Sequence, residues 1–122
     1  MTKKALFLCS SPRKDSKTNV IAGMVAEELY KKGVESELID VAHLNYATNG
    51  CIACYECQRS DKYECVIQDE ATPILNRIPL ADYLIFATPV YFMGPNAQMK
   101  LIMDRMFSYY KIHSSNPEEF SC

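Results

Sequence analysis

The sequence has almost no net charge, no long apolar run and little glycine, and each shortage excludes a class of protein. Its 13 Lys and Arg residues against 15 Asp and Glu give a formal net charge of -2. This balance gives no electrostatic reason to bind nucleic acid or an anionic membrane surface. The apolar run near the N-terminus is far too short for a signal peptide, and no later segment could span a bilayer. We therefore expect a cytoplasmic protein with no nucleic-acid or membrane partner.

A stretch near the N-terminus predicts a strand, a polar loop and a helix, in that order. The apolar run from Ala5 to Cys9 is typical of a strand buried on both faces. Apolar residues then recur at helical spacing from Val20 to Leu29, and Gly33 supplies a stop. The 122 residues, 48% of them hydrophobic, fit one domain over residues 1–122. The loop would lie at the carboxyl end of a strand, where parallel α/β sheets bind ligands.

The loop between this strand and helix has the chemistry of a phosphate site. Ser11, Ser16 and Thr18 supply hydroxyl donors, and Arg13 supplies a planar, permanently charged fork. Backbone N–H groups at a helix start also stabilise an anion. The loop contains no glycine, which excludes a Walker loop and a dinucleotide fingerprint. The alternative is a capped helix that follows a solvated basic turn.

Further strands and helices are predicted along the rest of the chain. Val34–Asp40 predicts a strand whose two glutamates suit a sheet edge. Asp69–Arg77 predicts a weak helix, and Ala81–Ala87 predicts a second strand of the buried type. The loop Thr88–Gly94 follows this strand, and a long helix begins at Pro95. The apolar stripe of that helix consists of Met99, Ile102, Met103, Met106 and Tyr110.

Four of the six cysteines lie close together in a loop over residues 50–66. They are Cys51, Cys54, Cys57 and Cys65, in the spacing C-x2-C-x2-C-x7-C. In a reducing compartment this grouping indicates metal or redox chemistry sooner than disulfides. A consecutive C-x2-C-x2-C run resembles ferredoxin ligation more than structural zinc, which usually pairs two separated C-x2-C hooks. An iron–sulfur cluster, a zinc ion and free thiols all stay open.

Three ordered motifs, SSPRKDSKT, CIACYEC and TPVYFMGPNAQMK, resemble the flavodoxin-like NAD(P)H-dependent FMN reductase family and its iron–sulfur flavoprotein branch. The resemblance implies an α/β fold, a flavodoxin-like parallel sheet with helices on both faces. It implies an FMN phosphate site at Ser11, Arg13, Ser16, Thr18 and Asn19. It implies contacts to the isoalloxazine ring from Pro89, Val90, Tyr91, Phe92, Met93 and Gly94. It also implies a four-iron (4Fe–4S) cluster on the four grouped cysteines. The alternative for Tyr91 and Phe92 is that they only cover the core.

The resemblance also implies that the sheet is incomplete. The family's sheet has five parallel strands in the order 2-1-3-4-5, and only three are recognisable here. The ending NPEEFSC resembles the linker into the fourth strand, so strands four and five would be missing. Strand Ala81–Ala87 would then keep one bare edge, which natural proteins protect. We therefore expect a homo-oligomer, or a second chain that completes the sheet.

The resemblance implies an FMN-dependent oxidoreductase that takes electrons from NAD(P)H and passes them through the flavin to an unknown small-molecule or protein acceptor. No residue stands out as a catalytic acid or base, and flavin hydride transfer does not require one. Two alternatives stay open. One is an electron carrier in which flavin and cluster exchange electrons, and the other is a truncated remnant that binds no flavin.

Overall fold

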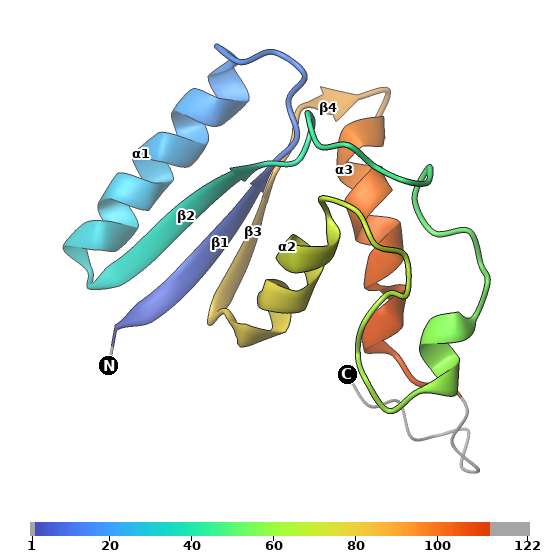
Figure 1. Cartoon of the computed structure of the whole chain (residues 1–122). Coiled ribbons are helices and arrows are strands. Elements are labelled where there is room, and N and C mark those ends of the chain that lie inside the picture. The colour runs from blue at the N-terminus through green and yellow to red at the C-terminus, as the bar shows by residue number, and fades with distance from the viewer. Residues whose placement is uncertain (1, 113–122) are drawn as a thin grey trace.

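Three parallel strands form the central sheet in the order β2-β1-β3 (Figure 1). The structure, a computed structural model, describes residues 2–112. β1 (Lys3–Cys9) pairs along its length with β2 (Val34–Asp40), and residues 5–9 of β1 also pair with β3 (Tyr83–Ala87). The predicted α/β class and parallel sheet are confirmed, and β2 lies at an edge as its glutamates predict.

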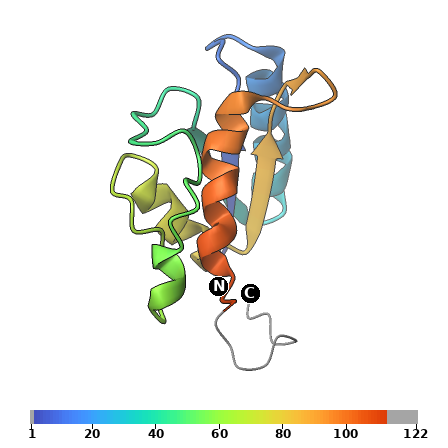
Figure 2. The ribbon, with the colours of Figure 1, turned by 90° about the vertical axis from the view of Figure 1, so that its right-hand side faces the viewer.

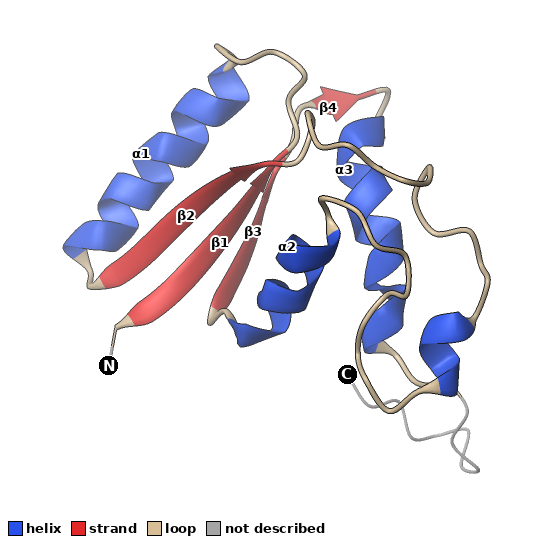
Figure 3. Ribbon diagram, viewed as in Figure 1, coloured by secondary structure: helices blue, strands red, loops and turns tan. Residues whose placement is uncertain are grey.

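Helices cover both faces of this sheet (Figure 3). α1 (Lys17–Lys31) lies on one face, and α2 (Thr72–Arg77) and α3 (Ala97–Met103) lie on the other. The short 3-10 helices are η1 (Glu56–Arg59), η2 (Ile78–Leu80) and η3 (Asp104–Tyr109). A small hairpin consists of β4 (Val90–Tyr91) and β5 (Gly94–Pro95).

β1 supplies side chains to two separate hydrophobic clusters, one on each face. Successive side chains of a strand point to opposite faces. Phe7, with Ala5 and Cys9, therefore packs under α1, whereas Leu6 and Leu8 pack against α2 and α3. All five residues are buried, as the continuous apolar run predicts.

α1 begins and ends as the sequence predicts, but it packs through a different set of residues. Ser16 caps its start, and Gly33 follows its end with φ at 81°. The small side chain of Ala22 faces the sheet, with Ala26 and Leu29 packed around it. The larger apolar side chains are exposed, and they form a ridge made of Val20, Ile21, Met24 and Val25.

The helix predicted from Pro95 is shorter as an α-helix than its apolar stripe suggests. α3 ends at Met103, and the chain continues as the 3-10 helix η3. Met99 and Ile102 are fully buried, whereas Tyr110 lies beyond η3 and is exposed. The predicted irregular tail, His113 to Cys122, lies outside the described residues. None of the helices in residues 2–112 has the length and apolar character needed to cross a membrane.

Candidate functional site

The first loop (residues 10–19) is fixed to the carboxyl ends of β1 and β3 by Ser10. This residue is fully buried, and its N–H donates to the Ala87 carbonyl at 2.9 Å. Its φ is not positive, so serine adopts this conformation without strain. Ser11 is also buried, and its hydroxyl oxygen accepts the Arg13 N–H at 3.2 Å. The loop therefore leaves the sheet from a rigid base, at the edge that the sequence predicts.

The helix start at the end of this loop is organised by Ser16. Its hydroxyl oxygen accepts the Asn19 N–H at 3.1 Å, which makes Ser16 the N-cap of α1. The capped-helix interpretation is thus realised, and it is compatible with anion binding because the Ser16 hydroxyl still has a proton to donate. Thr18 is half-buried, and Arg13 is exposed and free of ion pairs within residues 2–112.

The second loop (residues 88–96) contains the β4–β5 hairpin and exposes its apolar tip. Phe92 and Met93 are 100% and 92% exposed. Both have left-handed backbones, with φ at 44° and 74°, a conformation that favours glycine or asparagine. The full exposure of Phe92 does not fit the alternative that its ring covers the core, whereas Tyr91 is 50% exposed. The predicted contacts Pro89, Val90, Tyr91 and Gly94 lie in the same loop, with Val90 and Tyr91 exposed.

Asn96 joins the two loops, a role that the sequence pattern did not reveal. Its side-chain N–H donates to the Ser10 carbonyl at 2.6 Å, a contact across 86 residues. Its side-chain oxygen accepts the Met99 N–H at 3.1 Å and so caps α3. Thr88 completes the joint, because its hydroxyl oxygen accepts the Asn96 N–H at 3.2 Å. The only signal in the sequence is an asparagine directly before a helix.

The residues of the two loops fit a flavin mononucleotide in chemistry. Hydroxyls and an exposed guanidinium lie on the first loop, as an anionic phosphate requires. The side-chain oxygen of Asn19 is buried without a hydrogen-bond partner in the described part of the chain. Such an oxygen accepts from a hydroxyl, and the ribityl chain of FMN carries hydroxyls. The exposed apolar tip supplies surface of the kind that covers an aromatic ring.

The cysteine loop (residues 50–66) lies at the other end of α3–η3, away from the two joined loops (Figure 2). All four grouped cysteines line one small cavity. The remaining walls are mostly apolar, and they include Ile52, Val66, Ile67 and Phe107. In the part of the chain that the structure describes, no three Cys, His, Asp or Glu side chains are grouped to hold a metal ion. The predicted ligand set of four cysteines therefore stays a prediction.

The backbone of the cysteine loop is held in unusual conformations around Cys54. Ala53 and Tyr55, on either side of it, have φ at 55° and 60°. The Tyr55 ring packs edge-on against Phe107 of η3, with the ring centroids 5.8 Å apart. Strained residues of this kind persist only where the surroundings hold them, and they concentrate at functional sites.

Buried polar side chains fasten the cysteine loop to the end of η3. Gln58 donates to the Tyr110 carbonyl at 2.7 Å and accepts the Ile112 N–H at 2.9 Å. Lys111 is buried, and its ammonium donates to the carbonyls of Cys57 and Lys62. The loop is therefore a fixed part of the fold, although no regular element except η1 lies within it.

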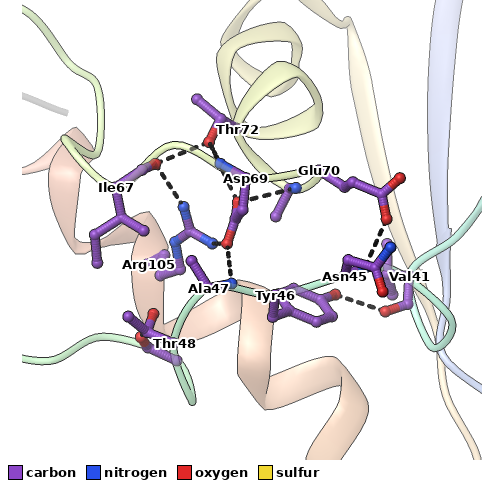
Figure 4. Close-up of polar contacts among 12 residues, drawn as sticks. Val41, Asn45, Tyr46, Ala47, Thr48, Ile67, Asp69, Glu70, Thr72 and Arg105 are labelled. Atoms are coloured by element: carbon purple, nitrogen blue, oxygen red, sulfur yellow. Dashed lines mark hydrogen bonds and ion pairs between the residues drawn. The ribbon is translucent and has the colours of Figure 1, made fainter.

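A buried ion pair between Asp69 and Arg105 lies at the base of the cysteine loop (Figure 4). Their closest N–O distance is 2.7 Å, and both side chains are almost fully buried. Burial alone would raise the pKa of Asp69, but hydrogen bonds from Arg105 and from the Ala47 N–H outweigh it and hold the pKa below its usual range. This pair could not be predicted, because nothing links the two residues before the chain folds.

Cys9 and His43 lie in structural surroundings outside the candidate sites. Cys9 is buried in β1, and burial raises the pKa of its thiol. His43 pairs with Asp40 at 2.7 Å on the surface. Neither residue lies among the groups that line the cysteine cavity.

Known proteins resemble this chain over most of its length. The family model of NADPH-dependent FMN reductase matches residues 3–120. An iron-sulfur flavoprotein of Methanocaldococcus jannaschii is 34% identical over 102 residues, which cover 84% of this chain and 51% of that protein. An iron-sulfur flavoprotein of Archaeoglobus fulgidus is 33% identical over 108 residues, which cover 87% of this chain and 46% of that protein. This chain thus spans about half the length of these relatives.

Two solved structures share the fold. An NAD(P)H:quinone oxidoreductase from Methanothermobacter marburgensis matches 91% of this chain and 58% of its own, with a TM-score of 0.72 and 21% identity. RosB, in complex with an 8-demethyl-8-formylriboflavin-5'-phosphate intermediate, matches 86% of this chain and 42% of its own, with a TM-score of 0.67 and 22% identity. Likeness at this identity supports the flavodoxin-like fold.

Proposed function

We propose, because this chain belongs to the NADPH-dependent FMN reductase family, that it binds FMN at its two joined loops and serves as an NAD(P)H-dependent oxidoreductase. Bound FMN would accept a hydride from NAD(P)H and pass the electrons to a small-molecule or protein acceptor. The observation that carries the proposal is the joint at Asn96, which holds a polar, cationic loop and an apolar loop side by side at the carboxyl edge of the sheet.

The two loops would bind different parts of FMN. Arg13, together with the hydroxyls of Ser11, Ser16 and Thr18, would hold the phosphate at the start of α1. The hairpin tip would cover one face of the ring with Tyr91 or Phe92, while its backbone N–H groups meet the ring edge. No acid or base in this chain is needed for the transfer, so the residues act by binding and orienting the ligand.

An FMN titration followed by flavin fluorescence tests the assignment. Loss of one charge-assisted hydrogen bond costs about 1.5–3 kcal/mol, roughly ten- to hundredfold in Kd. We expect this loss in Arg13→Ala and Ser16→Ala. Arg59→Ala is the matched control, because Arg59 is an exposed arginine in the cysteine loop. Unchanged affinity in both loop variants would contradict the proposed phosphate site.

A second function, electron transfer through an iron–sulfur cluster, is favoured by the single cavity that all four grouped cysteines line. A four-iron cluster takes one thiolate on each iron, so its ligands surround a volume and need not converge on one point. The thiols are free, and Cys51 and Cys57 already accept N–H hydrogen bonds at 3.4 Å each. A bound cluster would add a one-electron centre to the chain.

Anaerobic purification with iron and acid-labile sulfide analysis tests this second function. We expect about four irons and four sulfides for each chain, a stoichiometry set by the cluster type. Zinc without sulfide, or thiols without metal after anaerobic reconstitution, would contradict it. The visible spectrum of the same sample separates flavin, cluster and a colourless protein that binds neither.

A further inference from the structure

Arg105 is a charged side chain enclosed in the interior next to the cysteine cavity. It is 1% exposed and is one of the residues that line this cavity. One terminal nitrogen donates to Asp69 at 2.7 Å, and the other donates to the Ile67 carbonyl at 3.0 Å. A buried guanidinium is costly unless its donors find acceptors, and these two contacts satisfy two of its three nitrogens.

The Asp69–Arg105 pair holds both ends of the cysteine loop (Figure 4). Ahead of the loop, the Ala47 N–H donates to Asp69 at 2.9 Å. After the loop, the Ile67 carbonyl accepts from Arg105. The chain segments on either side of the four cysteines therefore meet at one ion pair, whose arginine lies on η3. The position of Arg105 thus fixes how the two ends of the cysteine loop lie relative to each other.

The third nitrogen of Arg105, Nε, differs from the other two in its contacts with the described residues. Nε is buried and forms no hydrogen bond with any described residue. The thiol of Cys65 lies beside the same guanidinium, and this cysteine also lines the cavity. A buried N–H donor without an acceptor is rare, and it suggests that an acceptor is provided in another state of the site.

We propose that Arg105 is a positioning residue for an iron–sulfur cluster, and that its Nε–H donates to the Cys65 sulfur when that sulfur ligates iron. The proposal rests on the cluster proposed above. A ligating thiolate is a stronger acceptor than a thiol, because it carries negative charge. Arg105 would therefore gain its missing partner when the cysteines are loaded.

This contact has a measurable consequence for the reduction potential. Hydrogen bonds to cluster sulfurs and nearby positive charge favour the more negative, reduced form. The measured step is the gain of one electron from dithionite, and Arg105 keeps its proton throughout. Loss of the Nε–H donor should therefore lower the potential, so that the cluster is harder to reduce.

The test uses the full chain, reconstituted anaerobically, with three variants. Arg105→Lys keeps the charge but removes the Nε donor. The double variant Asp69→Asn with Arg105→Met removes both buried charges, so that no unpaired charge prevents folding. Arg59→Met removes an equal charge from an exposed part of the same loop. Circular dichroism confirms folding, and redox titration by electron paramagnetic resonance gives the potential.

At a fixed potential, we expect the reduced-to-oxidised ratio to fall about tenfold in both Arg105 variants, which is about 59 mV for one electron. Arg59→Met should match the wild type. Folded Arg105 variants that no longer retain iron would also support the positioning role. Folded variants with wild-type iron content and potential would overturn this inference alone. A wild type without acid-labile sulfide would overturn both this inference and the proposed cluster.

Discussion

Replacement of Asn96 by alanine should destabilise the fold far more than loss of an ordinary helix cap. Asn96 is 1% exposed, and its side chain makes two kinds of contact at once. It caps α3 through the Met99 N–H, and it donates to the Ser10 carbonyl of the first loop. Alanine removes both contacts and leaves two buried backbone groups without this partner.

The magnitude follows from these two losses. Removal of an N-cap side chain costs about 1 kcal/mol. A buried carbonyl left without its donor costs about 1–3 kcal/mol more. We therefore expect Asn96→Ala to lower the free energy of unfolding by about 2–4 kcal/mol, a large share of the 5–15 kcal/mol that is roughly typical of a domain.

Urea unfolding followed by circular dichroism measures this loss, and two further variants divide it. Ser16→Ala removes the cap of α1 with no contact between the loops, so its loss should be only about 1 kcal/mol. Asn96→Ser keeps a capping hydroxyl but cannot reach across to Ser10, so it should lose mainly the joint. FMN titrations on the same variants show whether the joint also organises the ligand site.

An Asn96→Ala protein that is no less stable than Ser16→Ala at equal m-values would contradict this prediction. In that case the contact with Ser10 would contribute nothing to stability, and the two loops would be neighbours without being joined. Unchanged FMN affinity in a folded Asn96→Ala protein would separately remove the joint from the ligand site.

Three other predictions follow from the strained hairpin, the buried ion pair and the open sheet edge. The double variant Phe92→Asn with Met93→Gly places residues that tolerate a left-handed backbone at both positions. Its free energy of unfolding in urea should rise by about 1–3 kcal/mol, while its FMN affinity falls. A less stable variant would contradict the inference that these two residues are strained. The pKa of Asp69 lies below its unfolded value, so its contribution to stability should be present above about pH 4 and be lost as pH falls through the folded pKa. Urea unfolding across pH should show a steeper loss in the wild type than in the double variant Asp69→Asn with Arg105→Met, which leaves no unpaired buried charge. We propose that a second chain covers the edge of β3 that pairs with no described strand. Light scattering across a dilution series should then show association that Phe86→Lys weakens, and a monomer that binds FMN tightly at every concentration would contradict it.

The order of the main elements and several of their bounds could be predicted from the sequence, because they depend on local signals. The apolar run at residues 5–9 has the buried parallel pattern and forms β1. The bounds of β2 agree with the predicted Val34–Asp40, and Gly33 ends α1. The third strand was also predicted, although it begins at Tyr83, two residues later than expected.

The packing face of α1 could not be predicted, because periodicity locates an apolar stripe without naming its neighbour. Ala22 is small enough to let the helix approach the sheet closely, so it is buried. Ile21 and Val25 are more hydrophobic, yet they lie beside the open part of the sheet near Phe86. These two side chains are exposed because no described residue covers them at this part of the sheet.

The side-chain contacts that hold the candidate sites together could not be predicted for a related reason. Asn96 and Ser10 are separated by 86 residues, and Arg105 and Asp69 by 36. Only the fold brings each pair together. The side chains that face a ligand were found by their chemistry, whereas those that hold the facing residues in place carry no local pattern.

β1 contributes side chains to both hydrophobic clusters, and this has a consequence for how the molecule unfolds. Because Phe7 belongs to the cluster under α1 and Leu8 to the cluster under α2 and α3, neither half can separate from the sheet without exposing one side of the same strand. The two halves should therefore unfold as one cooperative unit. In hydrogen exchange, the amides of β1 should be the slowest in the chain and should exchange only by global unfolding, whereas the amides of the hairpin tip should exchange through local motion.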